Sequence, residues 1–206
     1  MKKLAFVALT TLSSSALAFE WKPEYYAGGG FATWQYSNTV INNRFEPSNY
    51  SIQSLEGFAG IQLIKYLKVE ARAGFGINTG REKLAIIDNA GTPTDPSDDS
   101  ITGFNDVEAE MDYFASVYLR PEVKNEKASL YGLLGFTTMD TSLTAPSTDP
   151  VPVQIEISDT FSGASYGIGA GFVVNEQFDV NIEWKKLIND EDFDMRGGSI
   201  SFNYNF

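Results

Sequence analysis

The sequence predicts an all-β protein, an eight-stranded antiparallel up-and-down transmembrane β-barrel. Three observations support this fold class. Apolar and polar residues alternate with the two-residue period of a strand in one segment after another. Short and long connections between these segments alternate strictly along the chain, as they do in a meander. No apolar run after residue 18 approaches the ~20 residues that a membrane-spanning helix needs.

The first 18 residues are expected to be an export signal that precedes the fold. The segment MKKLAFVALTTLSSSALA contains two lysines, an apolar stretch and a small-residue site at 16–18. This is the three-part pattern of a secretory signal peptide, and its apolar part is too short to span a bilayer. We therefore expect cleavage after Ala18, with residues 19–206 forming the barrel domain.

Composition argues against several classes of function. The chain of 206 residues has 27 acidic and 15 basic residues and a formal charge of −12, which disfavours nucleic acid and anionic surfaces as partners. The absence of Cys excludes disulfides and thiolate chemistry. The absence of His removes the commonest general base and the commonest zinc ligand. We expect a monomer without a cofactor, a catalytic residue or a nucleic-acid partner.

The strands and their connections can be placed in order along the chain. Eight strands are predicted over 25–36, 54–64, 67–78, 106–119, 128–143, 160–174, 178–187 and 197–206. Three connections are short and carry turn residues: 65–66, 120–127 and 175–177. Four are longer and polar: 37–49, 79–105, 144–159 and 188–196. An antiparallel meander then places the long loops at one end, and the short turns and both termini at the other.

The two faces of each strand indicate which side meets lipid. In 178–187, alternate apolar residues from Phe178 to Trp184 oppose polar ones from Asp179 to Lys185. In 106–119, Met111 and Tyr113 are assigned to the apolar face, opposite Glu110 and Asp112. A soluble lipocalin-like barrel would turn the apolar faces inward, whereas a transmembrane barrel turns them outward. The polar faces carry Gly74, Gly76, Gly167, Gly169 and Gly171.

These glycines favour the transmembrane arrangement. Side chains from all round a narrow barrel compete for one axis, so small residues are needed on the inner face. Strand-interior glycine is a liability on a water-exposed surface. Aromatic residues near strand ends fit interfacial girdles: Tyr25, Phe178 and Phe206, with Trp34 and Tyr36 as further candidates.

The inward charges are predicted to form an ion-pair network that holds the barrel's register, because buried charges need partners. A proton path or an acid pair is the alternative interpretation. The predicted members are Glu70, Arg72, Glu110, Asp112, Asp179, Glu183 and Lys185, with Glu108 and Arg120 also on inward faces.

Four motifs resemble the small outer-membrane β-barrel family that includes the transmembrane domain of OmpA and the OmpX/Ail group. They are YYAGGGFATW, LYGLLGF, ASYGIGAGFVVNEQFDVNIEWKKL and SISFNYNF, and the resemblance covers nearly all of residues 19–206. It implies a bacterial outer-membrane location and contact with lipid and lipopolysaccharide. It also implies that the barrel-assembly machinery recognises the last strand, through Phe202, Tyr204 and Phe206.

Three functions remain open from the sequence. The favoured one is a non-enzymatic surface barrel with a structural or adhesive role, whose loops meet host or envelope partners. An outer-membrane enzyme acting on lipid or peptide is disfavoured by the absence of His. A narrow diffusion pore is disfavoured because side chains fill the interior of an eight-stranded barrel.

One acidic stretch is a weak candidate for a metal site. The segment DPSDDS supplies Asp95, Asp98 and Asp99, whose oxygens suit Ca²⁺. It lacks the twelve-residue spacing and distal Glu of a dedicated calcium loop. The alternative is an acidic loop that is simply solvated.

Overall fold

The computed structural model describes residues 23–38, 49–88, 100–147, 153–189 and 193–206. The predicted signal peptide lies outside these residues. The described part of the chain is built from antiparallel strands, and it contains no helix long and apolar enough to cross a membrane. The strands are β1 (Tyr25–Asn38), β2 (Asn49–Ile64), β3 (Leu67–Gly76), β4 (Gly80–Asp88), β5 (Ser100–Lys124), β6 (Ala128–Ser147), β7 (Val153–Val173), β8 (Phe178–Asn189) and β9 (Phe193–Asn205).

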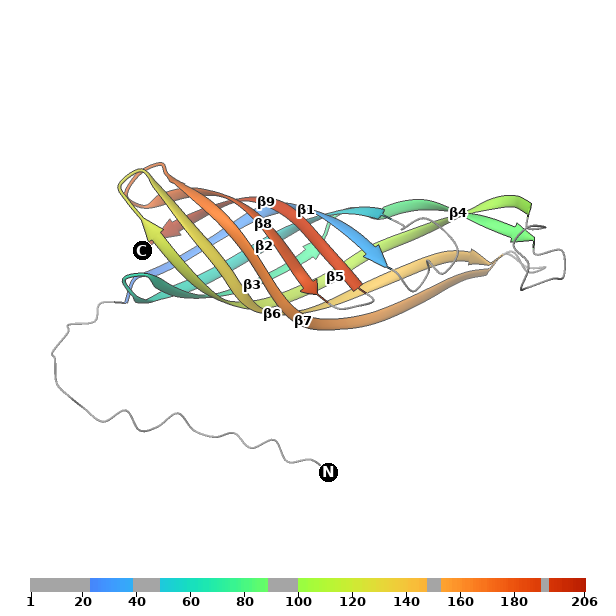
Figure 1. Cartoon of the computed structure of the whole chain (residues 1–206), viewed down its shortest axis with the longest axis horizontal. Coiled ribbons are helices and arrows are strands. Elements are labelled where there is room, and N and C mark those ends of the chain that lie inside the picture. The colour runs from blue at the N-terminus through green and yellow to red at the C-terminus, as the bar shows by residue number, and fades with distance from the viewer. Residues whose placement is uncertain (1–22, 39–48, 89–99, 148–152, 190–192) are drawn as a thin grey trace, which may run out of the picture.

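The sheet closes on itself into a barrel (Figure 1). Each strand pairs with its sequence neighbours, except that β3 and β4 do not pair with each other. β1 pairs with β9, and β3 pairs with β5. Both β3 and β4 pair with the long strand β5, so they are successive parts of one barrel strand interrupted at 77–79. The predicted closed barrel of eight antiparallel strands is confirmed.

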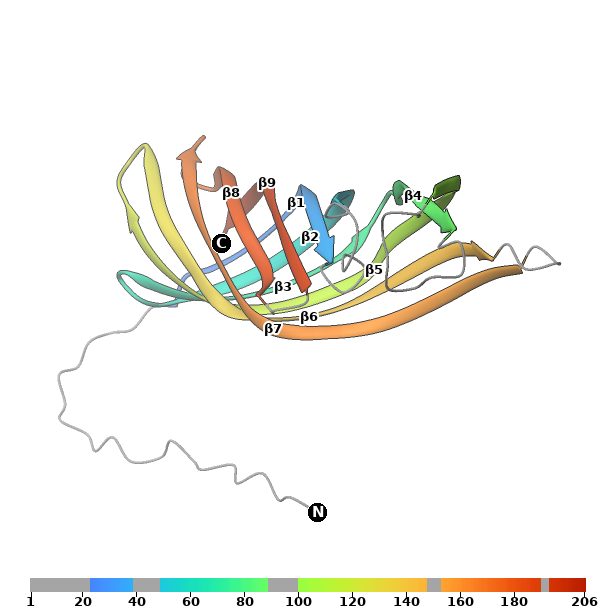
Figure 2. The same ribbon diagram turned by 45° about the vertical axis from the view of Figure 1, so that its right-hand side comes forward.

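Three strands continue well past the loop-side end of the barrel. β5, β6 and β7 have 25, 20 and 21 residues, whereas β8 has 12. A tilted strand crosses a membrane in roughly 9–11 residues. β4 to β7 therefore form a sheet, here called the projecting sheet, that runs beyond the ends of β1, β8 and β9 (Figures 1 and 2). The prediction that 79–105 and 144–159 are loops is wrong for most of both segments, because backbone pairing continues as far as Asp88↔Ser100 and Ser147↔Val153.

The outward face is an apolar band around the barrel, as predicted. Large apolar side chains such as Phe75, Val117, Leu134, Ile168 and Phe202 are more than half exposed. In a water-soluble protein such a continuous band would be a liability, whereas lipid covers it in a membrane barrel.

The predicted alternation is wrong at one place in β5. A bulge between Met111 and Tyr113 shifts the register against β6. The side chain of Met111 is therefore buried inside the barrel. Glu110 and Asp112, which were predicted to face the lumen, are exposed. An extra residue in one strand reverses the faces on one side of it.

The aromatic girdle is also smaller than predicted. Tyr25, Phe178 and Phe206 are exposed, and Tyr204 contacts both Phe178 and Phe206, with ring centroids 5.1 and 5.0 Å apart. Trp34 and Tyr36, in contrast, point inward and are fully buried. Their assignment to the girdle is wrong, because the inner face near the loops is apolar and accommodates large rings.

Inward glycines give these rings the space they need. A Cβ on Gly169 would lie 2.5 Å from ring atoms of Tyr131, and one on Gly74 would lie 2.4 Å from the Phe114 ring. Both distances are well inside van der Waals contact. The glycine-rich inner face is therefore crowded, as the sequence predicted.

Candidate functional site

The turn-side half of the lumen contains a buried ion-pair network centred on Arg72. Its guanidinium binds Glu183 through two hydrogen bonds, Nη1 to Oε2 at 2.6 Å and Nη2 to Oε1 at 2.7 Å. Arg72 Nε donates to Glu70, and Nη1 lies 3.3 Å from Glu56 Oε1. β3 and β8 lie on opposite sides of the eight-stranded ring, so the bidentate pair spans the lumen.

Lys185 forms the second cationic position of the network. Its Nζ donates to both oxygens of Glu56, at 2.8 and 2.7 Å, and lies 3.2 Å from Glu183 Oε2. The ammonium also lies 5.3 Å from the Trp34 ring centroid, within the range of a cation–π contact. Lys185 thus joins the network to the aromatic side chains above it.

Arg120 extends the network toward the turns. Its Nη1 donates to Glu70 Oε2 at 3.0 Å, and its guanidinium lies 3.6 Å above the Tyr131 ring. Glu122 Oε2 lies 3.0 Å from Arg120 Nε and 2.9 Å from Lys68 Nζ. The Glu122 contact with Arg120 is a charge contact without hydrogen-bond alignment.

Two tyrosines complete the coordination of the carboxylates. Tyr26 donates its hydroxyl to Glu70 Oε2 at 2.8 Å, and Tyr131 donates to Glu183 Oε1 at 2.7 Å. Ser199 Oγ adds a donor to Glu183 at 3.2 Å. Each of these carboxylates is therefore held by neutral donors as well as by cations, which is what buried charges need.

The charges of this assembly, which we call the ion layer, balance. Its four cations are Lys68, Arg72, Arg120 and Lys185, and its four carboxylates are Glu56, Glu70, Glu122 and Glu183. An equal number of both signs leaves this layer without net charge. Glu56, Glu70 and Glu183 accept hydrogen bonds from its cations, whereas Glu122 Oε2 makes charge contacts only.

The sequence identified part of the ion layer. Glu70, Arg72, Glu183 and Lys185 lie in it, together with Arg120. Asp179 belongs to a separate cluster nearer the turns, where it accepts from Lys124 at 2.8 Å and from Asn203 at 3.2 Å.

Other predicted members lie elsewhere. Glu110 is exposed beside the bulge, Asp112 accepts a 2.7 Å bond from Ser142, and Glu108 pairs with Arg81 at an exposed position. Three members of the ion layer were not predicted: Glu56, Glu122 and Lys68. Glu56 was detectable, because Ser54, Glu56 and Phe58 alternate with Leu55 and Gly57.

The loop-side half of the lumen is apolar. We call this cluster the apolar layer; all its members are almost completely buried, and Phe161 packs against it. Trp34 Nε1 donates to Ser54 Oγ at 2.7 Å, which satisfies the indole. The prediction of a polar lumen is wrong for this half. The members are Ala32, Trp34, Tyr36, Ile52, Ala109, Met111, Phe114, Met139, Leu187, Ile188 and Met195.

Hydroxyl groups join the two layers along β5, β6 and β7. Tyr118 and Ser165 are hydrogen-bonded at 2.5 Å, and Ser116 and Thr137 at 2.7 Å. Buried side chains therefore fill the described part of the lumen from the ion layer to the apolar layer. The described residues also bring no group of three or more acidic side chains together that could hold a metal ion. The candidates Asp95, Asp98 and Asp99 lie outside the described residues.

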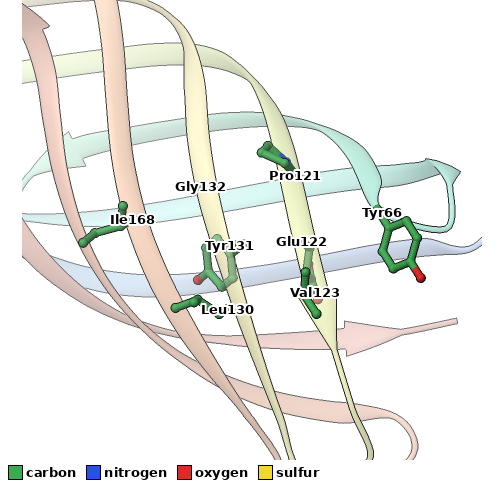
Figure 3. Close-up of a pocket in the computed structure, with 8 residues that line it drawn as sticks. All are labelled: Tyr66, Pro121, Glu122, Val123, Leu130, Tyr131, Gly132 and Ile168. Atoms are coloured by element: carbon green, nitrogen blue, oxygen red, sulfur yellow. The ribbon is translucent and has the colours of Figure 1, made fainter.

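The outer wall has a shallow hollow of about 490 Å³ near the turns (Figure 3). Its lining includes Tyr66, Pro121, Val123, Leu130 and Ile168, around the bare backbone of Gly132. The β5–β6 pairing is interrupted here, between Leu119↔Leu134 and Glu122↔Tyr131. Proline has no N–H to donate to a ladder. The apolar lining and the lipid-facing position make this hollow part of the lipid contact.

The family comparison decides the class of this barrel. Residues 4–206 match the model of the outer membrane protein beta-barrel domain. The chain belongs to this family. Its fold therefore places it in the bacterial outer membrane, with the short turns toward the periplasm and the long connections toward the outside. No curated protein matches the chain in sequence.

Solved structures of outer-membrane barrels have the same fold. Ail, the attachment invasion locus protein of Yersinia pestis, is 15% identical with a TM-score of 0.54, over 90% of this chain and 100% of that one. Neisserial surface protein A is 13% identical with a TM-score of 0.55, over the same shares. OprG of Pseudomonas aeruginosa is 15% identical with a TM-score of 0.50, over 89% of this chain and 95% of that one. At these identities the likeness concerns the fold.

Proposed function

We propose that the protein is a non-enzymatic surface protein of the outer membrane, with a structural or adhesive role carried by its loop-side end. The observation that carries this proposal is the contrast between a filled lumen and a long projecting sheet. Buried ion pairs and apolar side chains occupy the described barrel interior, whereas β5, β6 and β7 continue as paired strands outside it. Rigid scaffolds commonly carry their function on such projecting connections.

An enzymatic role is disfavoured by the available side chains. The chain has no His or Cys, so a nucleophile would need a carboxylate or lysine as its base. The two lysines of the ion layer, Lys68 and Lys185, are paired with its carboxylates. Asp112 and Ser142 do hydrogen-bond at 2.7 Å, but the neighbouring group is the Ser158 hydroxyl, 3.2 Å from Ser142 Oγ, and not a base of the kind that a triad requires.

Two ligand classes fit the loops. Acidic residues concentrate in 79–105 and 188–196, including Asp95, Asp98 and Asp99. Such loops suit weakly bound Ca²⁺ or Mg²⁺, or a basic host or envelope partner, with binding weakened by salt. One structure of Ail is described as a complex with the heparin analogue sucrose octasulfate. The net negative charge of the present chain favours the opposite sign of partner.

Shortening the projecting sheet tests this proposal. Residues 143–157 would be replaced by Asn-Gly between Ser142 and Ser158, which are paired in the β6–β7 ladder. A deletion strain would express the parent or the trimmed protein, and adhesion to host cells, serum survival and envelope leakage would be compared. The trimmed protein is expected to restore envelope integrity without restoring adhesion or serum survival.

The control is Glu176→Gln, in the exposed turn at the opposite end of the barrel, which is expected to behave as the parent. Full adhesion and serum survival by the trimmed protein, at equal surface levels, would contradict the proposal. A variant in which Asp95, Asp98 and Asp99 are all neutralised would then show whether the negative charge in 79–105 contributes to adhesion and serum survival.

We also propose that the end of β9 is read by the barrel-assembly machinery. Phe202 and Phe206 are exposed on the outward face, and Tyr204 links Phe178 and Phe206. Removing Phe206 should lower outer-membrane levels more than loss of one interfacial anchor explains. Normal surface levels of the shortened chain would show that the aromatic residue is only a lipid contact.

A further inference from the structure

We propose that the turn-side end of the lumen binds an alkali-metal cation, Na⁺ or K⁺, on oxygen atoms of Asp179, Asn181 and Ser201. The inference concerns the small polar cluster between the ion layer and the turns, and it is independent of the proposed adhesive role. It rests on three buried oxygen atoms without a hydrogen-bond partner among the described residues, and on the space that a glycine leaves beside them.

The carboxylate of Asp179 is satisfied at only one of its two oxygens. Oδ2 accepts three hydrogen bonds, from Lys124 Nζ at 2.8 Å, Asn205 Nδ2 at 3.1 Å and Asn203 Nδ2 at 3.2 Å. Oδ1 is buried and accepts none from the described residues. Burying a charged oxygen without a partner is costly. This side of Asp179 therefore requires a ligand.

Hydrogen bonding fixes which end of each neighbouring amide is free. An ionised carboxylate can only accept, so Asn203 directs its Nδ2 toward Asp179. The Oδ1 of Asn203 then accepts from Asn181 Nδ2 on the adjacent strand. The remaining polar atom of Asn181 is its Oδ1, which is buried and has no donor among the described residues. The two amides thus present a carbonyl oxygen, and not an N–H group, to the lumen.

Strand register brings these oxygens together around one glycine. Four successive partners across β9, β8, β7 and β6 lie in one row of the lumen wall: Ser201, Asn181, Gly171 and Ser129. A Cβ on Gly171 would lie 2.4 Å from Ser129 Oγ and 2.8 Å from Asn181 Oδ1. Both oxygens therefore face the space beside the bare glycine. Asp179 lies one row closer to the turns, on the same face of β8.

The chemistry of the cluster suits a cation of single charge. Its unpartnered atoms are the carboxylate oxygen of Asp179, an amide carbonyl oxygen and the hydroxyl of Ser201, which is completely buried. Hard cations take carboxylate and amide oxygens as ligands, and a hydroxyl oxygen has lone pairs to add. Lys124 already pairs with the carboxylate, but 36% of its side chain is exposed, so solvent screens part of its charge. One carboxylate shared with a lysine favours a monovalent over a divalent ion.

The cluster adjoins the periplasmic mouth of the barrel. A hollow of about 420 Å³ opens there, and its lining includes Glu24, Glu176 and Asn205. Asn205 also donates to Asp179, so the hollow reaches the edge of the cluster. Lys68 lines the hollow too, but it is paired within the ion layer. The exposed carboxylates of Glu24 and Glu176 make the entrance acidic, which attracts cations from the periplasm.

Equilibrium unfolding of the purified full-length barrel in detergent tests the site against a buried water, the alternative ligand for such oxygens. Urea midpoints would be compared in NaCl, KCl and choline chloride at equal ionic strength, because choline is too large for the cluster. A ligand that binds only the folded state raises the folded-to-unfolded ratio up to tenfold for each tenfold rise in its concentration above Kd. We expect this dependence on Na⁺ or K⁺. Equal midpoints in all three salts would overturn the proposal in favour of water.

Substitutions locate the ion. Asp179→Asn should abolish the cation dependence, and Ser201→Ala should weaken apparent affinity several-fold. The control is Ser116→Ala, which removes a buried lumen hydroxyl bonded to Thr137 at 2.7 Å and should keep the parental dependence. Lys124→Gln tests the sign of the effect. It should lower stability in choline because an ion pair is lost, yet tighten cation binding several-fold because a competing charge is removed.

Folding of the variants is checked separately. Each must keep the gel-mobility difference between unboiled and boiled samples that marks a closed barrel. Ser201→Ala removes an oxygen that bonds to no described residue, so it is expected to fold even if Asp179→Asn does not. Broadening of the sodium NMR signal by the folded parent, reduced in Ser201→Ala, is a readout that needs no unfolding. Parental cation dependence in every folded variant of Asp179 and Ser201 would overturn the site. None of these results bears on adhesion, because the trimmed projecting sheet leaves the turn-side lumen unchanged.

Discussion

The ion layer and the apolar layer fill two halves of the same lumen with opposite chemistry. In the turn-side half, Arg72 is held by three carboxylates from three strands. In the loop-side half, Trp34 packs edge-on to Phe114, with ring centroids 6.2 Å apart, among methionine and aliphatic side chains. Both halves exclude an open channel, but each stabilises the barrel differently.

The two layers should differ in how strongly a single substitution destabilises the barrel. Removing one partner of a buried ion pair leaves an uncompensated charge, so the ion layer should respond sharply to single substitutions. An apolar cluster accepts volume-conserving changes at small cost. We infer that the ion layer fixes which strands face one another across the lumen, whereas the apolar layer mainly fills space near the outer surface.

The largest effect is expected from Arg72→Ala. The substitution leaves Glu183, Glu70 and Glu56 short of a cation in a buried position, which costs on the order of 3–5 kcal/mol. Urea unfolding of the folded barrel in lipid vesicles would measure the loss. The matched control is Arg81→Ala, which removes an exposed pair worth about 0–1 kcal/mol. Equal unfolding midpoints for the two variants would show that water solvates Arg72 and that the ion layer is not structural.

A double variant sharpens this test. In Arg72→Met/Glu183→Leu one charge of each sign is removed, so the ion layer stays balanced at three cations and three carboxylates. We expect the double variant to be more stable than Arg72→Ala, because replacing a buried pair by apolar residues is often close to neutral. A double variant less stable than the single one would contradict charge balance as the governing factor.

A smaller loss is expected from Tyr131→Phe. It removes the 2.7 Å hydrogen bond to Glu183 and keeps the ring beneath Arg120. A hydrogen bond to a charged group contributes about 1.5–3 kcal/mol. The same unfolding assay would detect this loss, and an unchanged midpoint would mean that Arg72 and Lys185 suffice to hold the carboxylate.

The smallest effect is expected in the apolar layer. Met139→Leu conserves volume at a fully buried position and should cost less than about 1.5 kcal/mol. Its unfolding midpoint should lie closer to that of the parent than the midpoint of Tyr131→Phe. A loss of stability comparable to that of Arg72→Ala would mean that the two layers are equally sensitive to substitution, which would contradict the proposed difference between them.

The barrel can be predicted well from the sequence, because the patterns that indicate each strand lie within the strand itself. Alternation in 178–187, together with glycines such as Gly169, is enough to place the strand and choose its inner face. The lumen is harder to predict, because its contacts join residues far apart in the sequence: Arg72 and Glu183 are separated by 111 positions. Half of the network's carboxylates were not among the predicted members. Glu56 was overlooked although its alternation is local, and Glu122 lies in the segment 120–127, which was predicted as a turn but belongs to β5 as far as Lys124.

Two further errors have local physical causes. The bulge at Met111–Tyr113 reverses the inner and outer faces without a proline or glycine to mark it. The projecting sheet was predicted as loop, because 79–105 and 144–159 are polar and contain turn residues. Outside the membrane a strand needs no continuous apolar face, so backbone pairing alone extends β5, β6 and β7.

Electrical recording from the purified barrel in planar lipid bilayers tests the central claim most directly. The claim is that the two layers fill the lumen, so that any activity lies on the outer surfaces. The barrel would be delivered to the bilayer from lipid vesicles, and the gel-mobility shift of protein recovered from those vesicles would verify that it is folded. We predict no stable conductance steps in concentrated KCl. Reproducible steps of constant size from the folded barrel would show an open path through the lumen and contradict the account.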